Sequence, residues 1–175
     1  MRGKILTGFL ILVACGLFAL NVQVLNAHQW GSWHWDKNTI NMYVYGSKQA
    51  ESKAAIKDWD DHTDLKLPLK NSHTDVSVFG ANAGNTGWAG LASIKGYAFD
   101  WWHKWCWCKI THAHAQFNTY YSYTSANVQG VQCQEVGHTF GLDHSNTNGC
   151  MAKGYYSPNS NFSNSHNWAD VNAMY

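Results

Sequence analysis

Five residues in the stretch CQEVGHTFGLDH have the types and the spacing of a metal-binding catalytic site. On a helix, Gln134 and His138 are four residues apart, so their side chains project from one face about one turn apart and can bind the same metal ion. Glu135, beside the first ligand, can act as a general base on a metal-bound water. Gly141 lets the chain leave the helix, so that His144 can return to the same ion. Three protein ligands and an open fourth position are typical of catalytic zinc.

The same stretch resembles the long zinc motif of the metzincin peptidases, His-Glu-x-x-His-x-x-Gly-x-x-His. It matches every fixed position except the first, where this chain has Gln134. Met151 is similar to the methionine of the turn that lies beneath the metal in that clan. Within the clan the chain looks most like the matrixins, because the loop after the motif is short and a small helix is expected at the end. Tyr155 lies where matrixins place a tyrosine in the outer wall of the specificity pocket, although Lys153 replaces the usual proline.

The resemblance implies an α+β fold of mixed α/β type, with a zincin-like twisted sheet, an active-site helix and a short C-terminal subdomain. It also implies a secreted zinc endopeptidase that hydrolyses peptide bonds of extracellular proteins. One catalytic Zn²⁺ would be held by Gln134, His138 and His144. A zinc-bound water would attack the peptide carbonyl, with Glu135 as the general base. The alternative is a secreted binding protein, for a polymer or a protein ligand, on a catalytically inactive metzincin fold.

The amide at position 134 leaves several interpretations open. Gln is neutral, as a ligating His is, so zinc should still lower the pKa of its water from ~15.7 towards ~7. Amide oxygen is a poorer zinc donor than imidazole, which predicts a loss of about 10–100-fold in metal affinity. In the first interpretation the protein is an active peptidase with an amide ligand, and in the second it is a metal-binding but inert relative. In the third the motif is a chance match, or a substitute such as Asp143 binds the metal instead. The presence of Glu135, His144 and Met151 favours the active enzyme.

Four cysteines follow the expected leader: Cys106, Cys108, Cys133 and Cys150. In an oxidising compartment they can form two disulfides in three pairings. Cys106 and Cys108 are two residues apart and would share one face of a strand, which makes a bond between them less natural. If the fold is the one that the resemblance implies, Cys133 and Cys150 both lie just beneath the metal. We therefore prefer that pair, which would fix the motif helix to the supporting turn.

Residues 1–27 have the layout of a secretory signal peptide. Two basic residues precede an apolar run at 5–20, and cleavage is expected after Ala27. A lipoprotein at Cys15 is less favoured, because apolar residues continue well past it. The run is also shorter than the roughly 20 apolar residues that a membrane anchor usually needs.

Residues 28–175 are expected to form a single metzincin-like catalytic domain, because 175 minus 27 leaves 148 residues, enough for one core. Of 12 basic residues two lie in the leader, which leaves ten against eleven acidic ones. No basic patch or charged run indicates nucleic acid. We expect an extracellular protein or peptide as the partner, no stable membrane insertion, and a monomer.

Hydrophobic periodicity predicts the elements that must position the site. Strands are expected at 38–45, 74–79 and 109–119. Helices are expected at 47–61, 125–141 and 168–175, the second with Cys133, Val136 and Phe140 towards the core. Residues 80–96 contain five glycines and are expected to be a loop or a loosely paired strand region. This order predicts a mixed α/β fold that is not doubly wound.

Two further groups of residues could bind something. His112 and His114 would share one strand face, and matrixins hold structural calcium or zinc ions nearby, but the sequence identifies no full ligand set. We expect these histidines to line the cleft or lie on the surface, since the resemblance implies that their strand runs along the cleft and pairs with extended substrate. The aromatic cluster at 100–107 is expected to cover the core or line a subsite, with sugar or hydrophobic-polymer binding as the alternative.

Overall fold

A computed structural model of the protein describes residues 28–153 and 161–175. The helices and strands in chain order are β1 (Met42–Gly46), α1 (Gln49–His62), β2 (Leu69–Lys70), β3 (Val76–Ala81), β4 (Gly90–Asp100), β5 (Cys106–Asn118), α2 (Ser125–Thr139) and α3 (Ser165–Met174). All three predicted helices and all three predicted strands are present, with ends shifted by a few residues. The predicted signal peptide and Tyr155 lie outside the described residues.

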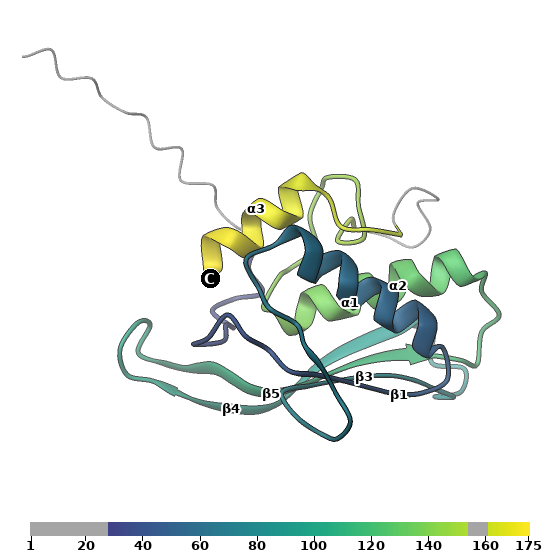
Figure 1. Cartoon of the computed structure of the whole chain (residues 1–175), viewed down its shortest axis with the longest axis horizontal. Helices are drawn as coiled ribbons and strands as arrows, with labels where there is room; N and C mark the ends of the chain where they lie inside the picture. The colour runs from purple at the N-terminus through teal and green to yellow at the C-terminus, as the bar shows by residue number, and fades with distance from the viewer. Residues whose placement is uncertain (1–27, 154–160) are drawn as a thin grey trace, which may run out of the picture.

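The strands form one five-stranded sheet in the order β2-β1-β3-β5-β4. All neighbours run parallel except β4, which pairs antiparallel with β5 at the edge. Parallel neighbours need crossover connections, and α1 lies in the one between β1 and β2. Figure 1 shows α1 and α2 together over one face of the sheet, with α3 beyond them. The predicted mixed α/β class is confirmed.

The core fills the space between the sheet and the two long helices. Its largest fully buried side chain is Trp59 of α1, whose Nε1 donates a hydrogen bond to the Cys133 carbonyl of α2 at 3.0 Å. Cys133, Val136 and Phe140 are buried, as the helix periodicity predicts. The face of α2 beside this stripe is therefore turned towards the edge of the core, where the motif side chains can reach solvent.

The edge strand is a correction to the sequence prediction. The strand predicted at 109–119 is β5, and it lies inside the sheet between β3 and β4, so it cannot pair with a substrate. The edge strand next to β5 is β4, which begins at Gly90 within the region expected to be a loop or loosely paired. Alternating hydrophobicity identifies a strand but not its neighbours, and the glycines weakened the strand pattern of β4.

His112 and His114 do not line the cleft. Their Nε2 atoms lie 3.1 Å apart, and the rings of Phe79 and His73 lie beside His114. Alternate residues of β5 such as Ala113 are buried in the core beneath the helices, so the two histidines occupy the opposite face of the sheet. Of the two locations expected for these histidines, the surface is confirmed and the cleft is wrong.

The described residues contain two disulfides, and together these bonds use all four cysteines that follow the expected leader. The preferred bond, Cys133–Cys150, is confirmed. Cys106 and Cys108 are also bonded to each other, although their spacing in a strand was expected to disfavour this. Two residues of a regular strand rise about 6.6 Å, but β5 starts irregularly after Trp105, whose φ is 48°, and the two cysteine Cα atoms lie 5.3 Å apart. That separation is ordinary for a disulfide.

The aromatic cluster at 100–107 forms the tip of the β4–β5 hairpin, which extends beyond the rest of the sheet in Figure 1. Four tryptophans there are exposed: Trp101, Trp102, Trp105 and Trp107, with Trp102 at 90%. None of them belongs to the buried core or lines the cleft described below. The expectation that they cover the core is therefore wrong, and no subsite of that cleft includes them.

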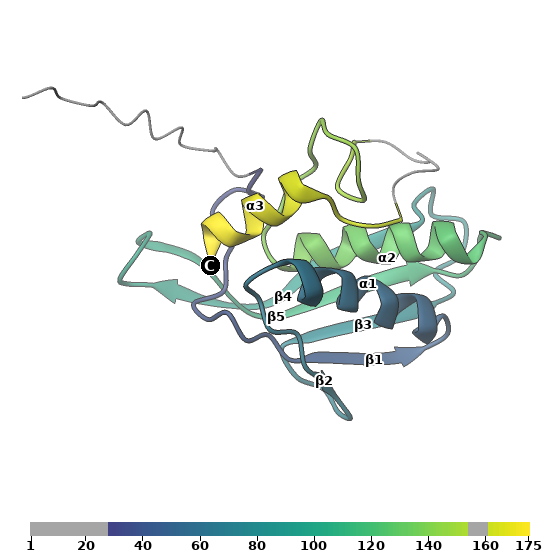
Figure 2. The ribbon, with the colours of Figure 1, turned by 45° about the horizontal axis from the view of Figure 1, so that its top comes forward.

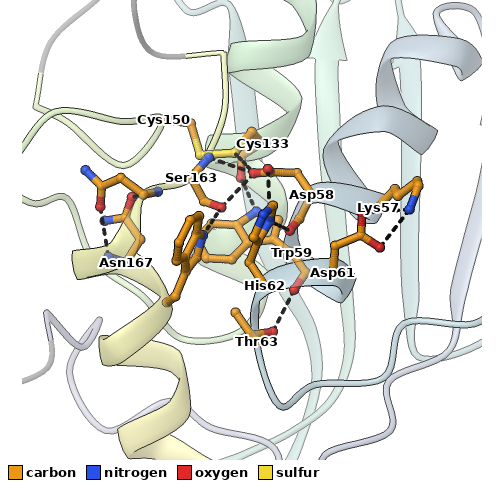
Figure 3. Close-up of polar contacts among 12 residues, drawn as sticks. Lys57, Asp58, Trp59, Asp61, His62, Thr63, Cys133, Cys150, Ser163 and Asn167 are labelled. Atoms are coloured by element: carbon orange, nitrogen blue, oxygen red, sulfur yellow. Dashed lines mark hydrogen bonds and ion pairs between the residues drawn. A yellow bond between two sulfur atoms is a disulfide. The ribbon is translucent and has the colours of Figure 1, made fainter.

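Asp58 joins α1 to the segment that leads into α3, as Figure 3 shows. Its Oδ2 accepts hydrogen bonds from the backbone N–H of Ser163 at 2.7 Å and from the Ser163 hydroxyl at 2.6 Å. The same hydroxyl accepts a bond from Trp168 Nε1, and the Trp168 ring stacks on His62 of α1. Val171 is fully buried, and Trp168 and Met174 pack against the core, so α3 is held by apolar contacts as well as by this carboxylate.

Replacing Asp58 with Ala is expected to lower the free energy of unfolding by about 1–3 kcal/mol, because the buried Ser163 N–H loses its acceptor. The matched control is Asp61→Ala on the same helix, whose carboxylate pairs, within the described part of the chain, with exposed Lys57. That variant should lose no more than about 0.5 kcal/mol. Urea unfolding of both variants measures the difference, and equal losses would contradict the role assigned to Asp58.

Candidate functional site

A cleft of about 520 Å³ lies between α2, the edge strand β4, the N-terminal segment and the turn that follows α2. The four residues predicted to carry chemistry all line it: Gln134, Glu135, His138 and His144. Met151 is buried behind them, and Tyr155 falls outside the described residues. The structure therefore gathers the predicted ligands and the predicted base at one concave surface.

The end of α2 explains how His144 returns to the cleft. The helix begins at a Thr124 cap, whose side chain accepts a bond from the Asn127 N–H, and its helical bonds stop at Phe140. Gly141 follows with φ 92°, a left-handed conformation that favours glycine, and a Cβ there would collide with the Trp33 carbonyl. The reversed chain then brings the ring of His144 to 4.7 Å, centroid to centroid, from that of His138.

His138 presents one defined nitrogen to the cleft. Its Nδ1 lies 2.8 Å from the Leu142 carbonyl, which can only accept, so Nδ1 carries the proton and Nε2 keeps its lone pair. Burial lowers the pKa of His138 and keeps the imidazole neutral. A metal-binding histidine is usually oriented in this way, with its second nitrogen donating to a carbonyl.

Gln134 is held by the turn that contains Met151. Its Nε2 donates a hydrogen bond to the Ala152 carbonyl at 3.1 Å. Because the amide nitrogen is engaged there, the amide oxygen is the atom left for a cation. Two imidazole nitrogens are ordinary zinc ligands, and the amide oxygen adds a third donor that is neutral but weaker. The residues present at this cleft therefore fit a zinc ion.

Asp143, the substitute ligand considered from the sequence, also lines the cleft. Its Oδ1 accepts the backbone N–H of His144 at 2.7 Å, and its side chain is exposed. The carboxylate thus stabilises the turn that carries His144, while Gln134 projects from the helix beside His138. The arrangement favours Gln134 over Asp143 as the third ligand.

Glu135 is wedged between α2 and the edge strand. It is only 7% exposed, and this burial raises the pKa of its carboxyl to about 8, against the opposing effect of a hydrogen bond from the Ala92 N–H. Gly90 makes the close approach possible, since a Cβ at that position would lie 2.5 Å from Oε1 of Glu135. A buried carboxyl with a pKa near neutrality suits general acid–base chemistry.

Met151 packs directly beneath α2. A Cβ on Gly137 would lie 2.5 Å from the Met151 sulfur and 3.0 Å from the Trp59 ring, so only glycine leaves room for the methionine. The Cys133–Cys150 disulfide joins the same two segments one residue before Gln134 and one before Met151. The turn and the helix are therefore fixed to each other both covalently and by packing.

The pKa of Glu135 predicts a pH dependence of stability in the metal-free protein. Its folded pKa, about 8, lies above the ordinary value of 4.5, so the folded state keeps a proton that the unfolded chain loses. This stabilisation is complete below pH 4.5 and is lost as the pH rises to about 8, by up to ~1.4 kcal/mol per pH unit. Glu135→Gln removes the titration.

Urea unfolding of chelator-treated wild type and Glu135→Gln at several pH values between 5 and 8 measures this effect. The free energy of unfolding of wild type should fall relative to that of the variant across this window. A difference that stays constant with pH would show that the carboxyl is not desolvated as the structure indicates.

Two parts of the cleft were not predicted from the sequence. Trp30 forms one wall, and its ring lies 5.9 Å from that of His138. Its backbone N–H donates a hydrogen bond to the Gly141 carbonyl at 2.7 Å. It sits in a short stretch without periodicity, so no pattern pointed to it. The other part is the start of β4, which lines the opposite side at residues 90–92.

Comparison with protein-family models and with curated proteins returns no match. Among solved structures, the chain is similar to two of myroilysin. One has 15% identity and a TM-score of 0.42 over 66% of this chain and 54% of that chain. The other has 16% identity and a TM-score of 0.41 over 66% and 48%. The chain thus spans about half the length of these structures. Likeness at this level assigns neither a family nor an activity.

Proposed function

We propose that this protein is a secreted zinc-dependent endopeptidase that hydrolyses peptide bonds in extracellular proteins. The observation that carries the proposal is the convergence of Gln134, Glu135, His138 and His144 on one cleft beside a sheet edge. The motif spans only eleven residues of sequence, yet Met151 fits against Gly137 of the motif and Gly90 of the edge strand fits against Glu135. A chance match to the motif would not bring these distant segments together.

Gln134, His138 and His144 would hold one zinc ion through the amide oxygen and one nitrogen of each ring. When bound, zinc supplies Lewis acidity towards the peptide carbonyl and lowers the pKa of water at the site. The cation would also favour the charged form of Glu135, whose pKa burial otherwise raises.

Glu135 performs the proton transfers in this proposal. Its carboxylate accepts a proton from the attacking water and then donates it to the nitrogen of the leaving amine. The Ala92 N–H holds the carboxylate in place from the strand side.

The edge strand β4 provides the place for an extended substrate. Residues 90–92 line the cleft, and β5 already occupies the other side of β4. An extended peptide could add to the sheet as a further strand beside β4, with its scissile bond over Glu135. This assigns to β4 the pairing that the sequence assigned to the strand at 109–119.

Secretion is part of the proposal. The leader at 1–27 predicts export, and the two disulfides, Cys106–Cys108 and Cys133–Cys150, suit an oxidising compartment. Among the described residues, no helix is both long and apolar enough to cross a membrane.

The test is elemental analysis of purified protein together with hydrolysis of casein, with and without a chelator. The proposal expects zinc in the protein, hydrolysis that the chelator abolishes, and recovery when zinc is returned. Zinc-loaded protein without any hydrolysis would favour an inert relative. Hydrolysis that persists after complete zinc removal would refute the assigned chemistry.

The exposed tryptophans of the β4–β5 hairpin favour a second candidate, a binding protein for a polymer or a protein ligand. Contiguous exposed apolar patches mark interaction sites, and four exposed tryptophans gather on this hairpin. A pull-down on insoluble polysaccharides, run beside the casein assay, separates the two functions. Loss of retention in Trp102→Ala, without any hydrolysis by wild type, would support the binding protein.

A further inference from the structure

Two histidines and an aspartate meet where the N-terminal segment contacts α3, outside the cleft. His28 Nδ1 lies 3.0 Å from His166 Nε2 and 3.2 Å from Asp170 Oδ2, and His166 Nε2 lies 3.4 Å from the same oxygen. His166 and Asp170 are one turn apart on α3. Both ribbon views bring the start of the described chain beside this helix (Figures 1 and 2).

When Asp170 is ionised, protons on the two rings alone do not satisfy this triangle of atoms. Each ring nitrogen carries either a proton or a lone pair in the ring plane. If both nitrogens are protonated, two N–H groups oppose each other across 3.0 Å. If His28 Nδ1 is unprotonated, its lone pair faces the carboxylate oxygen across 3.2 Å. If only His166 Nε2 is unprotonated, its lone pair faces that oxygen across 3.4 Å. With Asp170 as a carboxylate, each protonation state of the two rings leaves one repulsive edge.

A single cation satisfies all three edges together. Zinc binds imidazole nitrogen and carboxylate oxygen at about 2.0–2.1 Å in tetrahedral geometry, which places ligand atoms about 3.3 Å from one another. The separations of 3.0, 3.2 and 3.4 Å are close to this value. We propose that His28, His166 and Asp170 form a zinc site that is separate from the cleft.

The surroundings of the three side chains suit a bound cation. The Asp170 side chain is only 2% exposed, and a buried carboxylate is stabilised by a positive charge against it. The His28 and His166 side chains are 36% and 32% exposed. The ion is therefore reachable from solvent, and a water can fill the fourth position.

The ion would fix one wall of the cleft. The His28 carbonyl accepts the Asp143 N–H, and two residues later Trp30 donates to Gly141, so the N-terminal segment is tied along the turn after α2. Clamping His28 to α3 holds this segment at its first described residue. The Trp30 ring then stays against His138. The site would order the cleft without taking part in its chemistry, and it does not depend on the proposed peptidase function.

The experiment measures zinc content in untagged protein whose cleft ligands have been removed. The double variant His138→Ala/His144→Ala is dialysed first against Zn²⁺ and then against metal-free buffer. It should keep about one equivalent of zinc. Adding His28→Ala, which alters no buried core residue, should weaken zinc binding by at least about tenfold. Adding His103→Ala instead, at an exposed histidine of the hairpin, should change nothing.

Equal zinc retention with and without His28→Ala would overturn the proposal, as would a double variant that retains none. If the double variant does not fold, His28→Ala and His166→Ala are made singly in the wild-type chain. Each should then lose one equivalent relative to His103→Ala, and no loss would overturn the proposal. A wild type that keeps the α3 zinc but hydrolyses nothing would refute the peptidase alone. If zinc is lost when the cleft ligands His138 and His144 are replaced but not when His28 or His166 is replaced, the α3 site alone is refuted.

Discussion

Glu135→Gln is expected to reduce peptide hydrolysis by about 10²–10⁴-fold while the zinc content stays at the wild-type level. The amide oxygen of glutamine can still accept the hydrogen bond from the Ala92 N–H, so the side chain keeps its place between α2 and β4. What it loses is the ability to accept a proton from water and return it to the amine. The loss should therefore appear in kcat.

The chain has only one other glutamate, which makes the control a matched one. Glu51 lies on α1, where its carboxylate accepts a bond from the Ser125 hydroxyl, and it does not line the cleft. Glu51→Gln should hydrolyse casein at the wild-type rate. If Glu135→Gln were equally active with zinc bound, another group would have to be the base.

Gln134→His is expected to tighten zinc binding by about 10–100-fold, because imidazole nitrogen is a better zinc donor than amide oxygen. The structure adds a reason why the exchange should be tolerated. The Ala152 carbonyl, which now accepts the Gln134 amide N–H at 3.1 Å, is available to accept the N–H of the second ring nitrogen. Competition with a graded series of chelators measures the affinity of both proteins.

Gln129→His serves as the control, since it adds a histidine to the same helix at a position that does not line the cleft. Its zinc affinity should equal that of wild type. An unchanged affinity in Gln134→His would show that position 134 does not contribute a ligand. A Gln134→Leu variant that binds zinc as tightly as wild type would lead to the same conclusion.

The sequence predicted the parts of the site that lie close together along the chain. A fixed spacing on one helix determines that Gln134 and His138 point the same way, and Gly141 marks where the helix ends. The three helices, the confirmed Cys133–Cys150 bond and the mixed α/β class follow from equally local patterns or from the resemblance that those patterns carry.

The parts that were missed depend on neighbours that local patterns do not specify. Nothing in alternating hydrophobicity states that β5 lies inside the sheet or that β4 forms its edge. Trp30 is held at the cleft by a backbone hydrogen bond to Gly141, which lies more than a hundred residues later in the sequence. The Cys106–Cys108 bond requires an irregular start to β5 that regular strand geometry excludes. Tertiary pairing decided each of these features.

The disulfide between Cys133 and Cys150 encloses the whole motif in a covalent ring, since it spans 17 positions that include Gln134, His138 and His144. A single backbone cut inside that ring, by another protease or by a second copy of this protein, leaves the two fragments linked through sulfur. Such nicked molecules would migrate as intact chain on a non-reducing gel and separate into two bands after reduction. Batches of protein that look uniform without reductant should therefore be compared with and without it before their specific activities are interpreted.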